Sequence, residues 1–195
     1  MAITVAVETP LQDDVRQLIA ELNATLLTLT PPEFCFHMSA EQMAEPSTTL
    51  FVARQGAAAV ACGALCRHAE RTAEVKRMYT RPSHQGRGIG GRVLAEIEAL
   101  ARREGFAHLV LETGHRHPAA WRVYERAGFS RCGAVLNYAD CRYSVFYEKA
   151  LVDARRVRGA AFIAAEGAGH VTGGTRSEET LGARTRGNGA SRQPA

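Results

Sequence analysis

A glycine-rich stretch, Gln85 to Gly91, has the residue types that bind an anionic group. It reads Gln-Gly-Arg-Gly-Ile-Gly-Gly and lies between a strand-like run that breaks at Pro82 and an amphipathic segment. Glycines let several backbone N–H groups converge without obstruction by a Cβ atom, and the start of a helix adds the positive end of its dipole. The stretch therefore predicts a phosphate-bearing cofactor.

Two interpretations of this loop are open from spacing alone. Gly86-x-Gly88-x-x-Gly91 matches the dinucleotide fingerprint, in which Glu112 would be the ribose ligand. That fingerprint requires a buried parallel strand before the loop, whereas the run Glu74-Val75-Lys76-Arg77 is too charged to be buried on both faces. The other interpretation begins at Gln85 and reads Gln-x-x-Gly-x-Gly.

The elements that must position the loop follow from hydrophobic periodicity and turn residues. Strands are expected at residues 3–7, 48–54, 58–68, 72–80, 108–112, 129–132 and 143–148, and helices at residues 10–29, 39–44, 88–104 and 117–127. This order predicts an α/β (α+β) domain. Its mixed sheet should be antiparallel in the middle and parallel where a helix intervenes.

The strand at residues 72–80 leads directly into the loop. Strict alternation would divide its side chains between two faces, with one face holding Val75, Arg77 and Tyr79, and the other holding Glu74, Lys76, Met78 and Thr80. Gly63, in the strand before it, is expected to form a bulge. Residues 33–38 are too apolar for a plain exposed loop, and we expect them to line a pocket.

A second motif makes the Gln85 interpretation specific. Downstream of the loop the chain carries Ala120-x-x-x-Tyr124-x-x-x-Gly128-Phe129, and the strand before the loop ends in Tyr79-Thr80-Arg81-Pro82. Over roughly Ile3 to Leu151 the chain resembles the GNAT superfamily of N-acetyltransferases. The runs Ser144 to Lys149 and Leu111 to Gly114 look like one bacterial branch of small GNAT enzymes of unassigned substrate. The resemblance implies a mostly antiparallel sheet, flanked by helices and splayed at the cofactor site.

The resemblance also implies acetyl-coenzyme A as the cofactor. Backbone N–H groups from Gly86 to Gly91 would hold the pyrophosphate, with Arg87 at the rim, and the strand edge would pair with the pantetheine amides. His117 stands where many family members have asparagine, which puts that one contact in doubt. The cofactor-binding residues expected on this basis are Met78, Tyr79, Thr80, Gln85, Gly86, Arg87, Gly88, Ile89, Gly90, Gly91, His117 and Ala120.

The chemistry of acyl transfer to an amine requires a base and an acid. An acceptor amine is protonated at neutral pH, so a base must remove a proton before attack. Glu74 is the first candidate, and its alternative interpretation is a strand-edge carboxylate paired with Arg71 or Lys76. Tyr124 occupies the position of the family's general acid, and its alternative interpretation is a core aromatic residue.

The acceptor site is less defined. Glu112 is a second candidate base and Glu33 a third, while Glu33, His37 and Glu112 are candidate substrate contacts. We expect direct transfer in a ternary complex to a primary amine of a small molecule or peptide. No cysteine falls in the motifs, which disfavours an acetyl-cysteine route. The alternative class is a non-catalytic acyl-coenzyme A sensor that retains the cofactor loop without turnover.

Composition and charge limit which other classes of protein the chain can belong to. The 195 residues are 46% hydrophobic, and the five scattered cysteines include no Cys-x-x-Cys pair, which predicts neither a disulfide framework nor a metal site. Residues 1–150 hold 17 basic and 16 acidic side chains, so the net charge of +4 lies mainly in residues 151–195. We expect a GNAT domain at residues 1–151, a disordered Arg/Gly/Ala-rich tail at 152–195, a cytoplasmic monomer or homodimer, and no nucleic-acid or membrane partner.

Overall fold

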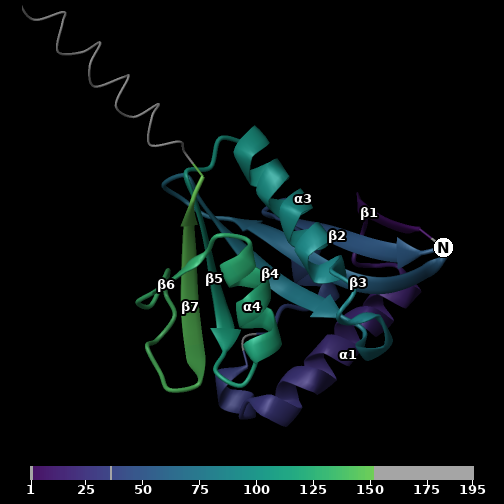
Figure 1. Cartoon of the computed structure of the whole chain (residues 1–195), viewed down its shortest axis with the longest axis horizontal. Coiled ribbons are helices and arrows are strands. Elements are labelled where there is room, and N and C mark those ends of the chain that lie inside the picture. Colours follow the sequence, from purple (N-terminus) through teal and green to yellow (C-terminus); the bar gives the residue numbers. More distant parts are fainter. Residues whose placement is uncertain (1, 36, 152–195) are drawn as a thin grey trace, which may run out of the picture. The chain divides into compact units, whose positions relative to one another are not determined.

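The computed structural model of the chain describes residues 2–35 and 37–151. The tail predicted at residues 152–195 lies outside this described part. The strands form one seven-stranded sheet in the order β1-β2-β3-β4-β5-β7-β6 (Figure 1). They are β1 Ile3–Val7, β2 Thr48–Gln55, β3 Ala58–Arg67, β4 Thr72–Thr80, β5 His108–Gly114, β6 Ser130–Cys132 and β7 Ser144–Ala150.

Strand pairing confirms the predicted mixed sheet. Neighbouring strands are antiparallel except for β4 and β5, which are parallel because helix α3 lies between them in the chain. The helices are α1 Asp13–Leu29, α2 Ala40–Met43, α3 Ile89–Arg103 and α4 Pro118–Arg126, with short 3₁₀ turns η1 Pro32–Phe34 and η2 Pro82–His84.

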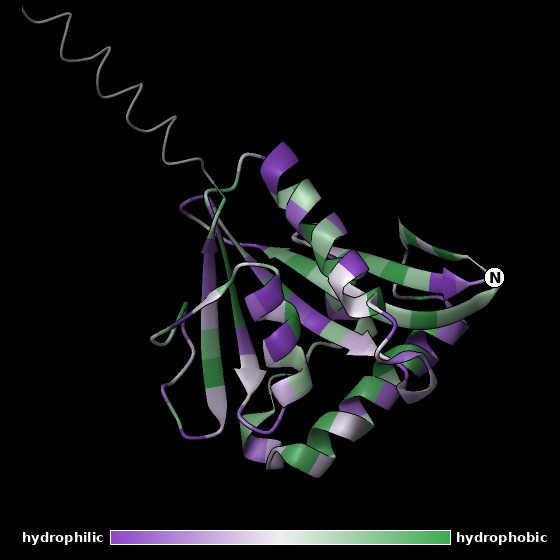
Figure 2. Ribbon diagram, viewed as in Figure 1, coloured by the Kyte–Doolittle hydropathy of each residue, from purple (hydrophilic) through white to green (hydrophobic). Residues whose placement is uncertain are grey.

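The helices cover the sheet with two separate apolar clusters. Side chains of α3 and α4 pack with one cluster, which includes Val93, Ile97 and Tyr124. Side chains of α1 and α2 pack with the other, which includes Val15, Leu18 and Met43. Figure 2 shows the corresponding alternation of hydrophobic and hydrophilic residues around α1 and α3. Each helix therefore lies where its apolar stripe can be buried against a strand layer.

The starts of α2 and α3 are set by local chemistry. Ser39 and Gln42 form a complete capping box at the start of α2, with Oγ of Ser39 accepting from the Gln42 N–H and the Gln42 amide oxygen accepting from the Ser39 N–H. Gly88 is the N-cap of α3 with φ of 73°. Because this φ lies in the left-handed region, only a glycine enters that helix without strain.

Strand β4 contains a bulge that the sequence did not predict at this place. Cys62 pairs with Tyr79 and Ala64 pairs with Lys76, so β4 holds one residue more than β3 between these pairs. Arg77, with φ of 56°, lies at this extra position. The bulge was predicted at Gly63, but Gly63 faces it instead. A Cβ atom on Gly63 would come within 2.4 Å of Sδ of Met78.

Because of the bulge, the side chains of β4 do not alternate as predicted. Val75 and Met78 pack with the cluster under α3, whereas Tyr79 packs with the cluster under α1. The prediction that Val75 and Tyr79 lie on one face was therefore wrong, because the alternation changes face after Lys76. The physical reason is the extra residue, since one inserted residue exchanges the two faces of a strand.

Strands β4 and β5 separate shortly after they begin. β4 pairs with β3 as far as Thr80, but it pairs with β5 only through its first three residues, Thr72, Ala73 and Glu74. Beyond Glu74 the two strands diverge, which Figure 1 shows plainly. The splayed sheet implied by the resemblance is confirmed, and the β5-facing edge of β4 carries no strand partner from Val75 onward within the described residues.

No helix in residues 2–35 and 37–151 is both long and apolar enough to cross a bilayer.

Candidate active site

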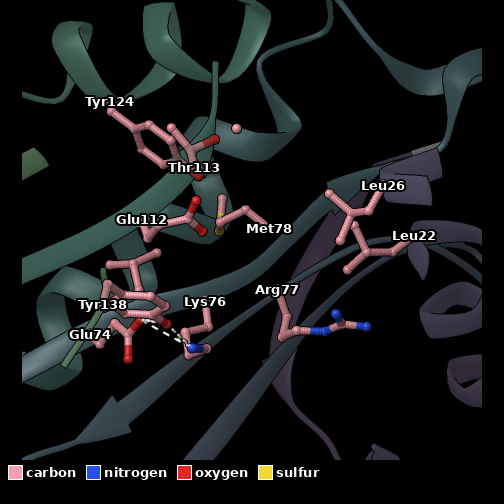
Figure 3. A pocket seen from close by; sticks show the side chains of 12 residues that line it. Leu22, Leu26, Glu74, Lys76, Arg77, Met78, Glu112, Thr113, Tyr124 and Tyr138 are labelled. Carbon is pink, nitrogen blue, oxygen red and sulfur yellow. Dashed lines mark hydrogen bonds and ion pairs between the residues drawn. The ribbon is translucent and has the colours of Figure 1, made fainter. Parts of the chain in front are cut away.

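A pocket lies where β4 and β5 separate. It has a volume of about 90 Å³, and Figure 3 shows side chains from both strands, α1, α4 and the β6–β7 loop around it. Its lining includes two predicted candidate bases, the predicted acid and a predicted cofactor contact, namely Glu74, Glu112, Tyr124 and Met78. Residues far apart in the chain therefore converge where the pairing of β4 with β5 ends.

Tyr124 is held in this pocket by aromatic packing. It lies on α4, and its ring is 6.0 Å from the ring of Phe129 and 5.9 Å from the ring of Tyr147, centroid to centroid. Burial, followed by the charge of Glu112, raises the pKa of the Tyr124 hydroxyl above its ordinary value. The described residues place no hydrogen-bond partner on that hydroxyl, so its proton is available to a ligand in the pocket.

Glu74 is buried and bound at both carboxylate oxygens. The residue is 2% exposed. Oε2 is 3.0 Å from Nε2 of His68, while Oε1 accepts from the Tyr138 hydroxyl at 2.6 Å and from Nζ of Lys76 at 3.2 Å. The pairing with Lys76 was anticipated, but Arg71 instead donates to the Gly105 carbonyl. The site thus holds a carboxylate whose burial is compensated by three polar partners.

Glu112 shares the pocket but is less tightly held. Burial raises the pKa of its carboxyl group, and the charge of Glu74 adds to this, while Ser144 and Lys76 act in the opposite direction. A carboxylate with a raised pKa is a stronger base than an ordinary one. Glu112 therefore has the electrostatic character of a proton acceptor, and Glu74 has the more complete hydrogen-bond network.

The predicted cofactor loop borders the start of α3. Gly86 and Gly88 have φ values of 74° and 73°, and a Cβ atom on Gly86, Gly88 or Gly91 would meet no atom within 4 Å. The first N–H groups of a helix have no carbonyl partner within it. The loop therefore offers open space, unhindered backbone and free donors, which is what a phosphate requires.

Three residues of the loop have side chains, and these differ in their surroundings. Ile89 is buried in the core, so only its backbone can face a ligand. Nε2 of Gln85 donates to the Thr80 carbonyl at 3.0 Å and ties the loop to the end of β4. Gly90 lies beside Thr80, since a Cβ atom there would be in ordinary van der Waals contact with Oγ1 at 3.6 Å. Arg87 is exposed at the rim.

His117 and Ala120 lie at the start of α4, facing the end of β5. The His117 ring packs over Gly114, where a Cβ atom would be 2.9 Å from Nε2. Nε2 is buried and has no hydrogen-bond partner within residues 2–35 and 37–151, and the side chain makes no capping bond to α4. Burial lowers the pKa of the ring. Contact of His117 with the cofactor stays a prediction.

Two predicted substrate contacts lie outside the pocket lining. Glu33 and His37 are exposed and flank the segment after α1. Burial and then the charge of Arg77 lower the pKa of His37, which places the ring within electrostatic reach of β4. Their contact with an acceptor stays a prediction.

Two residues of the site had no signal in the sequence analysis. Tyr138 comes from the β6–β7 loop, which has no periodicity, and it reaches Glu74 across 64 positions of the chain. Arg77 is 7% exposed and donates to the Asn23 side chain on α1, while its buried Nε has no hydrogen-bond partner in the part of the chain that the structure describes. Burial lowers the pKa of its guanidinium group. The sequence shows Arg77 only as a charged residue in a strand, which predicts neither its burial nor its hydrogen bond to Asn23.

A second, more open pocket of about 500 Å³ adjoins the first. It shares three lining residues with the first pocket, Glu74, Lys76 and Tyr138. It adds His68 and Glu70 from the β3–β4 turn and Thr72 at the start of β4. Among the described residues no three histidine, cysteine or acidic side chains are arranged to hold a metal ion. Cys62 is buried, and burial raises the pKa of its thiol to about 12, so it is a packing residue rather than a nucleophile.

Comparison with known proteins agrees with this geometry. A model of the Acetyltransferase (GNAT) family matches residues 16–129. The chain is 39% identical over 150 residues to an IAA acetyltransferase from Azospirillum brasilense, a match that covers 76% of this chain and 98% of that protein. A solved structure from Klebsiella pneumoniae, provisionally named an acyl-CoA N-acyltransferase, is 32% identical with a TM-score of 0.67, covering 77% of this chain and 98% of that one.

A more distant structure shares the fold alone. The PaiA N-acetyltransferase of Thermoplasma acidophilum, solved in complex with coenzyme A, is 17% identical with a TM-score of 0.63 and covers 77% of this chain and 99% of its own. The family match extends over more than half of the 195 residues, and it includes β4, the glycine loop and Tyr124. The chain belongs to the GNAT acetyltransferase family.

Proposed function

We propose that the protein transfers an acetyl group from acetyl-coenzyme A to a primary amine of a small molecule or peptide, by direct attack in a ternary complex. One observation carries this proposal. A buried tyrosine and two carboxylates line a single pocket where β4 and β5 separate, beside a glycine loop at a helix start. A proton donor and a proton acceptor at one site are what amine acylation requires.

Several features fit a bound coenzyme A. The loop at Gly86 to Gly91 has room and free N–H groups for a pyrophosphate. Among the described residues, the β5-facing edge of β4 beyond Glu74 has no strand partner and Nε2 of His117 has no hydrogen-bond partner. When bound, acetyl-coenzyme A supplies a thioester as the activated acyl group. Met78 to Thr80 would offer backbone N–H and C=O groups to the pantetheine amides, and Ala120 would leave space above them.

Glu74 is the proposed base. Oε1 accepts two hydrogen bonds, but Oε2 has only His68 beside it among the described residues and keeps a lone pair, and the side chain faces both pockets. It would take a proton from the acceptor ammonium and leave the neutral amine free to attack. Glu112 is the competing base, supported by its raised pKa.

Tyr124 is the proposed acid. Its raised pKa keeps the phenol protonated throughout the neutral range, and its hydroxyl has no partner among the described residues. It would hold a proton at Oη and donate it, or a strong hydrogen bond, to the departing thiolate. The charge of Glu112 contributes to the raised pKa, so ionised Glu112 helps to keep Tyr124 in its donor form.

The test is release of free thiol from acetyl-coenzyme A with a panel of acceptors. The panel includes amines, amino acids, polyamines and peptides, and also IAA, because a 39% identical relative is named for it. Turnover with at least one primary amine, with the acetylated amine identified by mass spectrometry, would support the proposal. Tight cofactor binding without turnover on any amine would contradict it and favour a sensor that only binds the cofactor.

A further inference from the structure

The wall of the narrow pocket contains a buried arginine that has no acidic partner. Arg77 lines this pocket and is 7% exposed. Within residues 2–35 and 37–151 the side chain makes one hydrogen bond, to the amide oxygen of Asn23 on α1, and Nε has no partner. Burial lowers the pKa of the guanidinium group, and no carboxylate acts against this effect. A buried charge is strongly unfavourable unless an opposite charge compensates it.

Arginines of the neighbouring strands are compensated in the usual way. Arg54 on β2 pairs with Glu8 at 2.7 Å. Arg67 on β3 pairs with Glu104 at 2.6 Å. Both are less buried than Arg77, yet Arg77 is the one of the three with no carboxylate partner among the described residues. Its surroundings therefore differ from those of an arginine that only stabilises the fold.

The bulge in β4 places Arg77 at one end of the pocket. The residue occupies the extra position of the bulge, with φ of 56°, and its carbonyl accepts from the Cys62 thiol at 3.4 Å. Bulges of this kind redirect a side chain. Figure 3 shows the Arg77 side chain on the same side as Leu22 and Leu26 of α1, apart from Glu74. The pocket thus has a positive end near α1 and a separate end with a carboxylate.

The chemistry of this positive end favours a carboxylate over a phosphate. A guanidinium group binds either anion with two parallel N–H donors. A doubly charged phosphate would need a second cation, but the neighbouring ammonium of Lys76 is already paired with Glu74. Leu22 and Leu26 make this end of the pocket apolar, and a low local dielectric strengthens a single ion pair. A single carboxylate therefore matches the one guanidinium group.

We propose that Arg77 binds a carboxylate of the acceptor, so that the acceptor is an amino acid whose amino group lies toward Glu74 and Glu112. This inference rests on the proposed amine acetylation and names its substrate class. Arg77 only donates hydrogen bonds in this scheme and exchanges no proton. The charges of the pocket match a zwitterion, because a cation lies near α1 and two carboxylates lie on β4 and β5.

The experiment measures how strongly the enzyme prefers a carboxylate. Alanine, leucine, phenylalanine and β-alanine are each compared with their own carboxamide in the thiol-release assay, since the amide keeps the amine and the shape but removes the charge. We expect kcat/KM of the best amino acid to exceed that of its amide about 10- to 100-fold in wild type, and Arg77→Met to abolish this preference mainly through KM. Comparing the ratio between variants cancels the different basicity of the two amines.

Two further variants separate charge from geometry. Arg77→Lys keeps a positive charge but loses the paired donors, so it should retain only part of the preference. Methionine and lysine are both unbranched at Cβ, so neither adds a β-branch at this left-handed position. Arg67→Met is the matched control, because it removes a strand arginine that already has a carboxylate partner, and it should keep the wild-type preference.

Binding can be measured without turnover. The N-acetyl derivatives of the same amino acids retain the carboxylate but have no amine to acetylate. With coenzyme A present, they should raise the unfolding temperature of wild type by several degrees at about 100-fold above their Kd, and their carboxamides should not. Neither should stabilise Arg77→Met. Without ligands, Arg77→Met should unfold at the same or a higher temperature than wild type, because it removes an uncompensated buried charge.

Other results overturn the proposal in distinguishable ways. An unchanged preference in Arg77→Met would place the carboxylate elsewhere. Equal loss of activity on acid and amide, together with a lower unfolding temperature, would show that Arg77 only ties β4 to α1. A wild type that prefers amines without a carboxylate would contradict the substrate class. Absence of turnover with every amine would refute the proposed function itself, and the unfolding temperatures would still show whether Arg77 binds a carboxylate.

Discussion

Two carboxylates in one pocket differ in what surrounds them, and that difference predicts which of them is the base. Glu74 is bound by three polar partners and connects the two pockets, whereas burial raises the pKa of Glu112. We expect Glu74→Gln to lower kcat about 100-fold, because the amide keeps the volume but cannot take a proton. Steady-state kinetics with the best amine of the panel measure this, with the exposed Glu96→Gln as the control.

The opposite result for the two glutamine variants would identify the other carboxylate as the base. If Glu112→Gln loses activity while Glu74→Gln does not, the base is Glu112 and Glu74 only supports the pocket. Thermal unfolding of both variants must accompany the kinetics, since Glu74→Gln removes the charge that compensates partly buried Lys76.

Glu112 also gives a pH-dependent prediction of stability. A carboxyl group whose pKa is raised by folding binds more protons in the folded chain, so its contribution to stability is present below the unfolded pKa of about 4.3 and is lost as pH rises through the folded pKa. We therefore expect Glu112→Gln to unfold at a higher temperature than wild type at pH 7, with little difference below about pH 4. An equal or lower unfolding temperature at pH 7 would contradict the pKa shift.

At the scale of elements, the bulge in β4 opens the site, and Gly63 makes room for it. A Cβ atom on Gly63 would lie 2.4 Å from Sδ of Met78 and 2.8 Å from Cγ1 of Val93. We expect Gly63→Ala to lower the free energy of unfolding by about 1–3 kcal/mol through overpacking. Because Met78 would have to move, coenzyme A affinity should also fall.

The matched control for this substitution is Gly133→Ala, where a Cβ atom meets nothing within 4 Å. Urea unfolding gives the stability of both variants, and isothermal titration with coenzyme A gives the affinity. Unchanged stability in Gly63→Ala would show that Met78 and Val93 yield without cost. In that case the absence of a side chain at Gly63 would not be required for the bulge in β4.

The sequence predicts the elements far better than it predicts how they meet. Helix and strand periodicities are local properties, so the order of elements and the mixed sheet were predictable from them, whereas the splay was implied only by the resemblance to the GNAT family. The left-handed conformation of Arg77 was not predictable, because residues other than glycine adopt it uncommonly and nothing in the strand-like run 72–80 marks this position. Tyr138 was missed for a similar reason, since its partner Glu74 lies in a distant strand and its own loop has no pattern.

At the scale of the whole molecule, Leu151 marks the end of the proposed acetyltransferase domain. Its N–H donates to the Ala107 carbonyl at 2.7 Å, its carbonyl accepts from Arg102 at 2.5 Å, and its side chain is buried. We expect a chain that ends at Leu151 to keep the unfolding temperature and kcat/KM of the full chain. Ending it at Ala150 should cost about 1.5–3 kcal/mol, because a buried leucine is lost.

Differential scanning calorimetry and the thiol-release assay on both shortened chains check this boundary. A large loss of activity in the chain that ends at Leu151 would contradict it. Residues 152–195 would then belong to the functional unit, although the family match ends at residue 129.

The central claim is that acetyl transfer takes place in the pocket between β4 and β5, with Tyr124 as the proton donor. Its most direct test is the Tyr124→Phe variant, which removes one hydroxyl while keeping the ring that packs on Phe129 and Tyr147. We expect kcat to fall about 100-fold with the affinity for coenzyme A nearly unchanged. An unchanged kcat in a variant that binds the cofactor normally would contradict the claim.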